Sequence, residues 1–370
     1  MKSISVLCMV LCSIFASAGE TTLYSFQGGS DGSYPATGLL MDQTGNLYGT
    51  TSNSVFELSP NGQGGWIKTT LADVTDNGFY VAPILDTEGN LYGVSAQTVY
   101  ELSPGQSGWT FAALHVFTST VSGLGIDEAG NIYGTTELGG RLGGGTVFRL
   151  SNSDGKWTFK TLHAFEANGA AGRDPRGSLV VAQDGTIYGV ASFGGGYSNG
   201  VFYSLSPGNW EERVLFSFRG KSRNEGGPIF GLSADQKGNL YCVYGGAFTD
   251  DENILEFSMN SKGVWMHKGI YTFHQSNDGW APTGTLFIDQ NGNAYGTTVE
   301  GHGGRGDITG GTVYELTPNT VGFWTETILY TFPLRFSPRG HLVRDNAGNL
   351  YGTTEAGGDS NFGTVFEVAP

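Results

Sequence analysis

The chain has 370 residues, of which 61 are glycine and 13% are aromatic, a mixture that excludes both a disordered chain and the three-residue glycine period of collagen. Its 19 Lys and Arg residues against 34 Asp and Glu residues give a formal net charge of −15, which repels phosphate backbones and anionic lipids and argues against nucleic acid or membrane surfaces as partners. Gly-rich turns between short aromatic and β-branched runs predict an all-β protein.

The first 18 residues have the pattern of a secretory signal. Lys2 precedes an apolar run over residues 6–15, and the Ala-Ser-Ala of residues 16–18 fits a cleavage site. The run is shorter than the ~20 apolar residues that span a membrane. We therefore expect cleavage near Ala18, secretion to the periplasm or the extracellular space, and no transmembrane segment. Cys242 is then the one cysteine of the mature chain, so no internal disulfide is expected.

A short phrase, GNLYGTT at residues 45–51, recurs along the chain. Its seven copies begin at residues 45, 89, 130, 185, 238, 292 and 348. An apolar run such as TGLLMD precedes each copy, and a run such as SVFELSP follows it. In the first six units a segment led by Trp comes next, at Trp66, Trp109, Trp157, Trp210, Trp265 and Trp324. Each unit therefore predicts four short strands.

The segments between the first two predicted strands of a unit, such as DQTGN at residues 42–46, contain the Asp and Gly-Asn residues of a tight hairpin turn. Five residues supply too few oxygen ligands for calcium, which needs six to eight. We therefore predict hairpins at these segments, and we expect neither a metal site nor a cofactor.

Seven units of four strands predict a seven-bladed β-propeller that forms a single domain over residues 19–370. The last unit, ending in TVFEVAP at residues 364–370, has no Trp-led strand, whereas TTLYSF at residues 21–26 stands alone at the start. A blade without its outer strand would expose an unpaired sheet edge. We therefore predict that residues 21–26 pair with the C-terminal blade and close the ring.

The phrases GNAYGTT, GGTVYELTP and WTETILYTF at residues 292–332 resemble the GloVer tandem repeats of secreted bacterial "choice-of-anchor" proteins. The resemblance extends over nearly all of residues 21–370. It implies a secreted bacterial propeller and does not imply a particular activity.

The repeat separates scaffold residues from candidates for binding, because a residue type found in every unit belongs to the blade. The Tyr of each phrase and the six leading Trp residues are therefore predicted to pack between strands. His115 and His163 occupy a position held by Tyr in other units, and Cys242 occupies one held by Gly. The two His residues are predicted to pack as the Tyr does, and Cys242 is predicted to be a buried substitution.

The variable loops of one face are the predicted ligand-binding region, since binding residues gather in loops on a rigid frame. Trp280 lies outside the repeated Trp position and is predicted to be either a platform for a sugar ring or a loop plug. His341 stands where other units have Gly, Ala, Ser or Thr, at the start of the innermost strand. We expect its side chain near the mouth of the central channel.

Further polar and aromatic residues of these loops complete the predicted binding surface: Arg173, Arg176, Arg305, Arg335, Arg339, His302, Tyr34 and Tyr80. Arginine suits carboxylates such as those of uronic acids. Acidic residues are at least as numerous on the same loops, so pairing among the loop residues is the alternative.

Three functions follow as hypotheses. The first is a monomeric secreted module that binds a glycan or another surface polymer through the variable loops. The second is a polysaccharide lyase for a uronate-containing polymer, with His341 and either Arg339 or Arg305 as the reacting group. The third is a scaffold for protein partners. The chain shows neither a serine-nucleophile elbow nor a zinc-type His motif.

Overall fold

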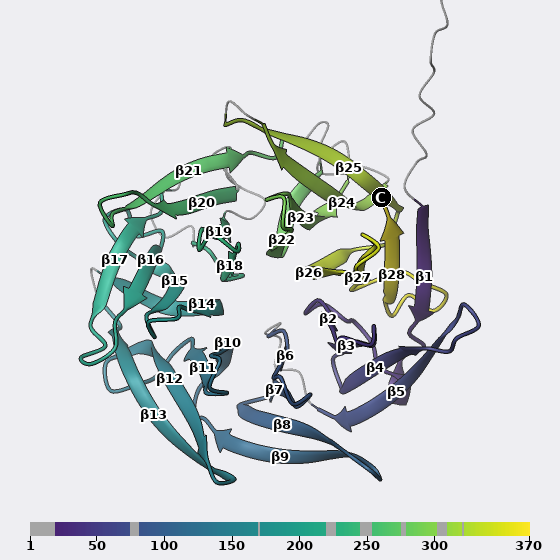
Figure 1. Ribbon diagram of the computed structural model, residues 1–370, viewed down its shortest axis with the longest axis horizontal. Helices are drawn as coiled ribbons and strands as arrows, with labels where there is room; N and C mark the ends of the chain where they lie inside the picture. Colours follow the sequence, from purple (N-terminus) through teal and green to yellow (C-terminus); the bar gives the residue numbers. More distant parts are fainter. Residues whose placement is uncertain are drawn as a thin grey trace, which may run out of the picture.

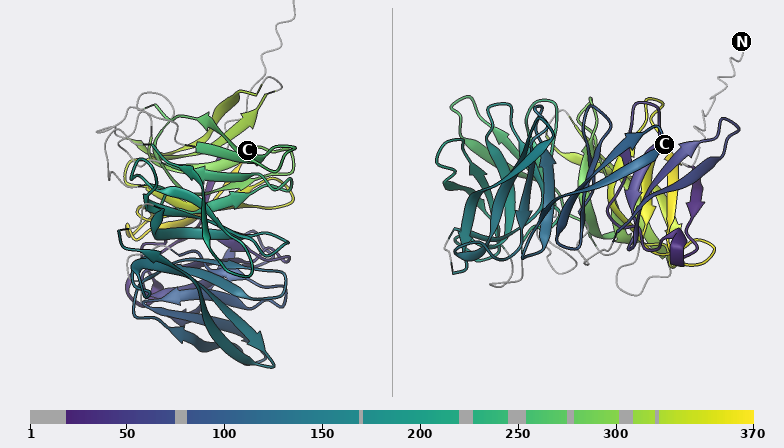
Figure 2. Two further views of the ribbon diagram at one scale, coloured as in Figure 1. Left: turned by 90° about the vertical axis from the view of Figure 1, so that its left-hand side faces the viewer. Right: turned by 90° about the horizontal axis from the view of Figure 1, so that it is seen from below.

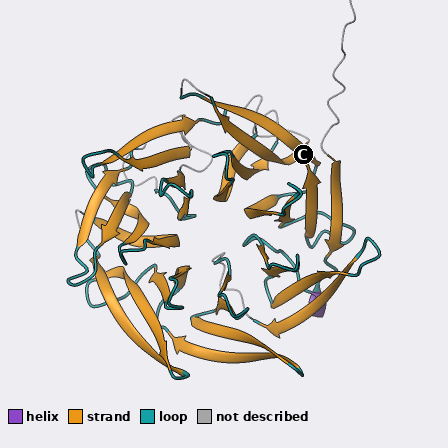
Figure 3. Ribbon diagram, in the orientation of Figure 1, coloured by secondary structure: helices purple, strands orange, loops and turns teal. Residues whose placement is uncertain are grey.

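In the computed structural model, seven four-stranded antiparallel sheets stand around a central channel (Figure 1, Figure 3). The structure describes residues 19–74, 81–168, 171–219, 227–244, 254–274, 279–301, 309–319 and 322–370. The predicted signal at residues 1–18 lies outside the described residues. Seen from the side, the strands cross the thickness of the ring and the loops lie on its two faces (Figure 2).

Each sheet is one blade, and its strands follow one another outward from the channel. The innermost strands are β2 (Leu40–Met41), β6 (Ile84–Leu85), β10 (Val121–Ile126), β14 (Gly172–Val181), β18 (Leu232–Ala234), β22 (Trp280–Ile288) and β26 (Pro338–Arg344). The second strands are β3 (Leu47–Thr50), β7 (Leu91–Ser95), β11 (Ile132–Thr136), β15 (Ile187–Gly194), β19 (Leu240–Val243), β23 (Ala294–Glu300) and β27 (Leu350–Thr354).

The third strands are β4 (Ser54–Pro60), β8 (Thr98–Gly105), β12 (Gly143–Ser153), β16 (Val201–Leu205), β20 (Ile254–Met259), β24 (Thr309–Pro318) and β28 (Thr364–Ala369). The outermost strands of blades 1 to 6 are β5 (Trp66–Asp73), β9 (Gly108–Val116), β13 (Lys156–Glu166), β17 (Glu212–Ser217), β21 (Trp265–Tyr271) and β25 (Trp324–Pro333). A short 3-10 helix, η1 (Gly29–Asp31), lies between the first strand of the chain and blade 1.

Blade 7 takes its outermost strand from the other end of the chain. Strand β1 (Gly19–Ser25) pairs antiparallel with β28, from Gly19 opposite Ala369 to Ser25 opposite Thr364. The predicted closure of the ring is therefore confirmed, with the strand beginning at residue 19 and ending at residue 25. Figure 1 shows the two strands side by side at the rim. The N-terminal strand thus covers the edge that blade 7 would otherwise expose.

The predicted hairpin between the first two strands of a blade is confirmed, and one Asp side chain explains its shape. In blade 3, Oδ1 of Asp127 accepts hydrogen bonds from the backbone N–H groups of Ala129 and Asn131. Its Oδ2 accepts from the Asn131 amide and from the Tyr133 hydroxyl, at 2.8 and 3.0 Å. The same Asp–Tyr contact recurs at Asp42, Asp86, Asp235, Asp289 and Asp345.

The repeated Tyr and Trp residues pack against each other between neighbouring blades, as predicted. The Tyr of one blade meets the Trp of the next edge-on, in the pairs Tyr48–Trp109, Tyr92–Trp157, Tyr188–Trp265, Tyr241–Trp324 and Tyr351–Trp66. Strand β1 carries no Trp for Tyr295. Arg344 stands there instead, with its guanidinium 5.3 Å from the Tyr295 ring centroid and 3.2 Å from Asp289.

A Gly in the second strand faces an aromatic ring in the third strand of six blades. In blade 3, a Cβ atom on Gly134 would lie 2.3 Å from Cζ of Phe148, too close for any side chain. The other such pairs are Gly49–Phe56, Gly93–Tyr100, Gly189–Tyr203, Gly296–Tyr314 and Gly352–Phe366. Blade 5 has Cys242 opposite Leu255. The smaller Leu leaves room for the thiol, and the predicted burial of Cys242 is confirmed.

Candidate functional site

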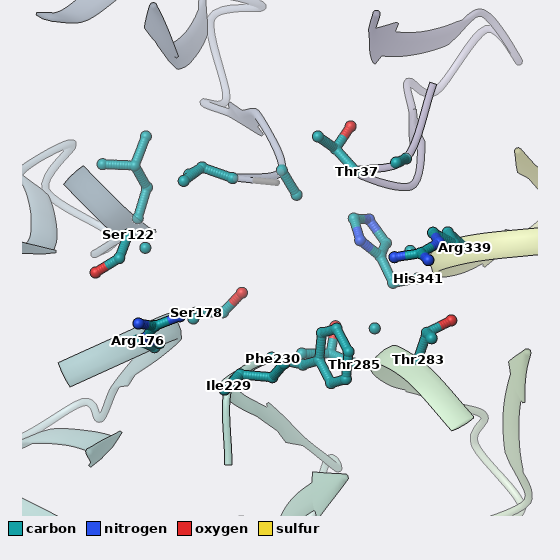
Figure 4. Close-up of a pocket in the computed structure, with 18 residues that line it drawn as sticks. Thr37, Ser122, Arg176, Ser178, Ile229, Phe230, Thr283, Thr285, Arg339 and His341 are labelled. Carbon is teal, nitrogen blue, oxygen red and sulfur yellow. The ribbon is translucent and has the colours of Figure 1, made fainter. Parts of the chain in front are cut away.

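The innermost strands of all seven blades enclose a cavity of about 250 Å³ in the central channel (Figure 4). Its polar side chains are Thr37, Ser122, Arg176, Ser178, Thr283, Thr285, Arg339 and His341. Its apolar wall includes Val81, Leu124, Ile229 and Phe230. The cavity therefore combines hydroxyl groups, one imidazole and two guanidinium groups with an apolar side.

Adjacent innermost strands approach so closely that the wall admits only small residues at several positions. A Cβ atom on Gly177 would lie 2.1 Å from the backbone nitrogen of Gly231, and one on Gly340 would lie 2.1 Å from that of Gly38. Gly177 and Gly340 also have positive φ angles of 70° and 80°, which favour glycine. The backbone itself thus forms much of the wall between blades.

His341 is the large residue in this ring of small ones. Its backbone forms a parallel bridge with Gly38 of blade 1, and its ring projects into the cavity (Figure 4). Burial lowers the pKa of His341, while hydrogen bonding with the backbone of Leu39 and Thr37 opposes that effect. The imidazole is consequently neutral at pH 7, and part of its hydrogen-bonding capacity is used by the backbone of blade 1.

Both arginines of the cavity already have carboxylate partners. Arg176 pairs with Glu137 and with Asp174, whose Oδ1 lies 3.2 Å from the arginine Nε. Arg339 lies with its Nε 2.6 Å from Oε2 of Glu355. The two positive charges are matched by three carboxylates. The cavity therefore presents no net positive charge to a ligand.

The hydroxyl groups of the cavity are held from behind by threonines of the second strands. Thr37 bonds to Thr50 and Ser122 to Thr135, each at 3.0 Å between oxygens. Thr283 bonds to Thr297 at 3.1 Å. These three hydroxyl groups therefore point outward to the second strands, and Ser122 also donates to the carbonyl oxygen of Pro175 at 2.7 Å (Figure 4).

The predicted binding residues divide into two groups. His341, Arg339 and Arg176 line the same cavity, although they come from blades 4 and 7. Trp280 begins β22 opposite Glu300 and is half-buried. Among the residues that the structure describes, the cavity wall does not include Trp280.

Three further predicted residues lie on the loop face away from the cavity. Tyr34 is 46% exposed and packs edge-on against Phe362, at 5.8 Å between centroids. Arg173 lies with its guanidinium 4.8 Å from the ring centroid of Phe193. Arg335 is exposed. The predicted residues Tyr80, His302 and Arg305 lie outside the described residues.

The hydroxyl residues of the cavity were not predicted as binding residues. Ser178 and Thr285 share the aligned position of His341, and Thr37, Ser122 and Thr283 stand within two places of it. Small polar residues at a position where other units have Gly or Ala were therefore the available signal.

In the described ranges, no group of three or more His, Cys, Asp or Glu side chains is arranged to hold a metal ion. No helix in these ranges has both the length and the apolar character needed to cross a bilayer.

The seven closed blades around a lined channel define the chain as a β-propeller. Residues 52–253, more than half of the chain, match the Gloeobacter/Verrucomicrobia repeat family, so the protein belongs to this family. This confirms the resemblance seen in the repeats. No curated protein matches the chain.

Solved structures with the same fold have very different sequences. A streptogramin B lyase is 15% identical and has a TM-score of 0.60, with 94% of this chain and 96% of that chain covered. A virginiamycin B lyase from Staphylococcus aureus is 12% identical with a TM-score of 0.60, over 95% of this chain and 99% of that one. A protein from Lactobacillus plantarum is 12% identical with a TM-score of 0.54, over 81% and 85%. These similarities show the fold alone.

Proposed function

We propose that this propeller is a glycan-binding module that holds one neutral sugar unit in the channel cavity. The observation that carries the proposal is a cavity with an apolar side that is lined by a neutral imidazole and by the Ser178 hydroxyl, which points into it (Figure 4). A sugar ring presents hydroxyl groups at its edge and apolar C–H groups on its face. Both surfaces therefore find matching partners in the cavity.

The charges of the cavity favour a neutral sugar over a uronate. A uronate carboxylate would have to compete with Glu137 and Asp174 for Arg176, and with Glu355 for Arg339. Bringing another negative charge beside these carboxylates is unfavourable in a partly buried site. The arginines instead stabilise the wall of the cavity.

The size of the cavity supports a single sugar unit. Its volume of about 250 Å³ is below the ~300–1,000 Å³ of pockets that enclose drug-sized ligands. The rest of a polymer would extend over the loop face, where Tyr34 is exposed. The predicted secretory signal supports the proposal because it would bring the protein to the compartment where such polymers are found.

A polysaccharide lyase is the second candidate, and His341 favours it. A neutral imidazole projecting into a cavity can accept a proton from a substrate. A lyase removes the proton next to a uronate carboxylate, so this candidate requires a uronate unit beside His341, and its carboxylate would have to displace an acidic partner of Arg176 or Arg339. A lyase would release an unsaturated product, whereas a binding module would leave the glycan intact.

Affinity electrophoresis of residues 19–370 in gels that contain neutral or uronate polysaccharides tests both candidates. We expect retardation by a neutral polymer, lost in His341→Ala and weakened in Ser178→Ala. Blade 2 carries Ala82 at the aligned position of His341 and Ser178, so both variants should fold. Lys237→Ala, an exposed change in the hairpin turn between β18 and β19, is the matched control and should migrate as the original protein does.

The outcomes separate the two candidates. Retardation that survives in His341→Ala would place the glycan elsewhere, and retardation by uronate polymers alone would contradict the neutral site. Absorbance of an unsaturated product on incubation with the uronate polymers would identify a lyase.

A further inference from the structure

The interface between blades 4 and 5 differs from its neighbours. At five interfaces an aromatic ring of the third strand packs against a Phe of the preceding blade. This Phe lies near the end of the outermost strand or just after it. The pairs are Phe26–Phe56, Phe117–Phe148, Phe165–Tyr203, Phe273–Tyr314 and Phe332–Phe366. Between blades 4 and 5 the third-strand residue is Leu255, and Phe218 packs on Tyr244 instead, at 4.7 Å between centroids. Tyr244 replaces a Ser, Thr or Ala of the other blades.

These substitutions accompany a second cavity of about 800 Å³, here called the blade 4–5 pocket. Phe216, Phe218, Tyr244 and Leu255 form its apolar wall. Phe218 and Leu255 are 0% and 3% exposed, so this wall continues directly into the core. A flat apolar ligand would gain contact with aromatic rings that are already held in place.

The rim of the blade 4–5 pocket carries a cation. Arg219 is exposed, and its guanidinium lies 4.9 Å from the ring centroid of Tyr197, itself 43% exposed. Within the described ranges Arg219 forms no ion pair, in contrast to Arg176 and Arg339 of the channel. Its guanidinium therefore has donors available for a carboxylate.

We propose that the blade 4–5 pocket binds a small aromatic carboxylate. The ring of the ligand lies against Phe216 and the small exposed part of Tyr244, with the fully buried Phe218 packed behind them, and its carboxylate pairs with Arg219. The apolar wall without the cation would favour any hydrophobic ring, and the cation without the wall would favour any anion. Their combination selects a ligand that has both groups.

This site is independent of the proposed glycan site, because the two cavities share no lining residue. Residues 220–226 and 245–253 follow Arg219 and Tyr244 in the chain and lie outside the described residues. The proposal uses none of them.

Isothermal titration calorimetry with trans-cinnamate and with cinnamyl alcohol tests the proposal. Both probes carry the same ring, and only cinnamate carries a carboxylate. We expect Arg219→Gln to weaken cinnamate binding about tenfold and to leave cinnamyl alcohol unchanged, since one charge-assisted contact is worth about one factor of ten. Arg213→Gln, an exposed arginine on the neighbouring strand β17, is the matched control and should change neither probe.

A second variant tests the apolar wall. We expect Tyr244→Thr to weaken both probes at least tenfold, because it removes a ring from the wall and introduces the residue that four other blades carry there. The midpoint of thermal unfolding, measured on each variant, verifies that the ring is intact. Cinnamate that does not bind the original protein, or that binds Arg219→Gln and Tyr244→Thr as well as the original, would overturn the proposal.

Discussion

Glu212 and His163 meet across the interface of blades 3 and 4, and burial shifts the pKa of each. His163 donates from Nδ1 to the carbonyl oxygen of Trp210 at 2.9 Å, and its Nε2 lies 3.9 Å from Glu212. Glu212 also accepts a hydrogen bond from the backbone N–H of Gly172 at 2.7 Å. Burial raises the pKa of Glu212 to about 7 and lowers the pKa of His163. Both neutral forms are therefore favoured in the folded protein.

The raised pKa of Glu212 predicts a loss of stability as the pH rises. In the unfolded protein Glu212 releases its proton near pH 4.5, whereas in the folded protein it keeps the proton until about pH 7. The contribution of this group to the stability of the folded state is therefore fully present below pH 4.5. It is lost as the pH rises toward 7. Glu212→Gln cannot ionise. We expect it to match the original protein at pH 4.5 and to exceed its free energy of unfolding by about 1–3 kcal/mol at pH 8.

Urea denaturation at pH 4.5, 6 and 8 would measure the difference. Glu211→Gln, on the exposed neighbour, is the control and should follow the pH profile of the original protein. A Glu212→Gln variant with the original pH profile would contradict the assigned pKa.

For single residues, the sequence predicted which side chains pack inside the protein better than it predicted which side chains contact each other. The burial of Cys242 and the packed place of His163 followed from comparing the same position in seven units. The contact between His163 and Glu212 did not follow, because it joins strands of two blades and depends on their angle. The aromatic stack of His115 on Phe159, at 4.1 Å between centroids, was missed for the same reason.

The hairpin between the first two strands of a blade depends on one carboxylate. Four hydrogen bonds converge on Asp127, including two from backbone N–H groups of the turn. We expect Asp127→Ala to lower the free energy of unfolding by about 1–3 kcal/mol, since it leaves several donors without their acceptor. Glu128→Ala, on the exposed next residue, should change it by less than about 0.5 kcal/mol. Equal effects of the two variants in urea denaturation would contradict this account.

The Gly–aromatic pair within a blade predicts a coupled effect of two substitutions. Gly134→Cys should lower the free energy of unfolding by about 1–3 kcal/mol, because the new side chain meets Phe148. Phe148→Leu alone should also lower it, through loss of packing. The double variant reproduces the Cys–Leu pair of blade 5. We therefore expect it to be more stable than the sum of the single effects predicts, and simple additivity in a double-mutant cycle would refute the pairing.

The ring as a whole depends on strand β1. A protein that begins at Phe26 would leave the backbone of β28 unpaired along the edge of blade 7. We expect this truncated protein to self-associate and to lose a single cooperative unfolding transition. Size-exclusion chromatography with light scattering and thermal unfolding, compared with residues 19–370, would measure both effects. A monomer with the original transition would show that blade 7 is stable with three strands.

The whole fold could be predicted from the sequence because each of seven units repeats the same signal. The number of blades, their four strands and the closure by residues 21–26 all follow from that repetition. The cavities could be predicted only where one residue breaks a repeated position, as His341 does. The blade 4–5 pocket was not predicted, because its walls come from Phe216, Tyr244 and Leu255. These residues lie in separate strands or loops, and only the packing of these segments decides whether a cavity remains between them.

The closure of the ring also determines the order in which the molecule can assemble. The backbone N–H of Asp359 donates a hydrogen bond to Ser25 Oγ, although the two residues are 334 positions apart in the chain. Forming this contact has a high entropic cost until the blades encoded between the two residues have folded. Blades can fold as local units, but the last interface forms only when both ends arrive together. Folding should therefore be slow in its final step. During that delay the edge of β28 is exposed, and the yield of correctly closed protein should fall as its concentration during refolding increases.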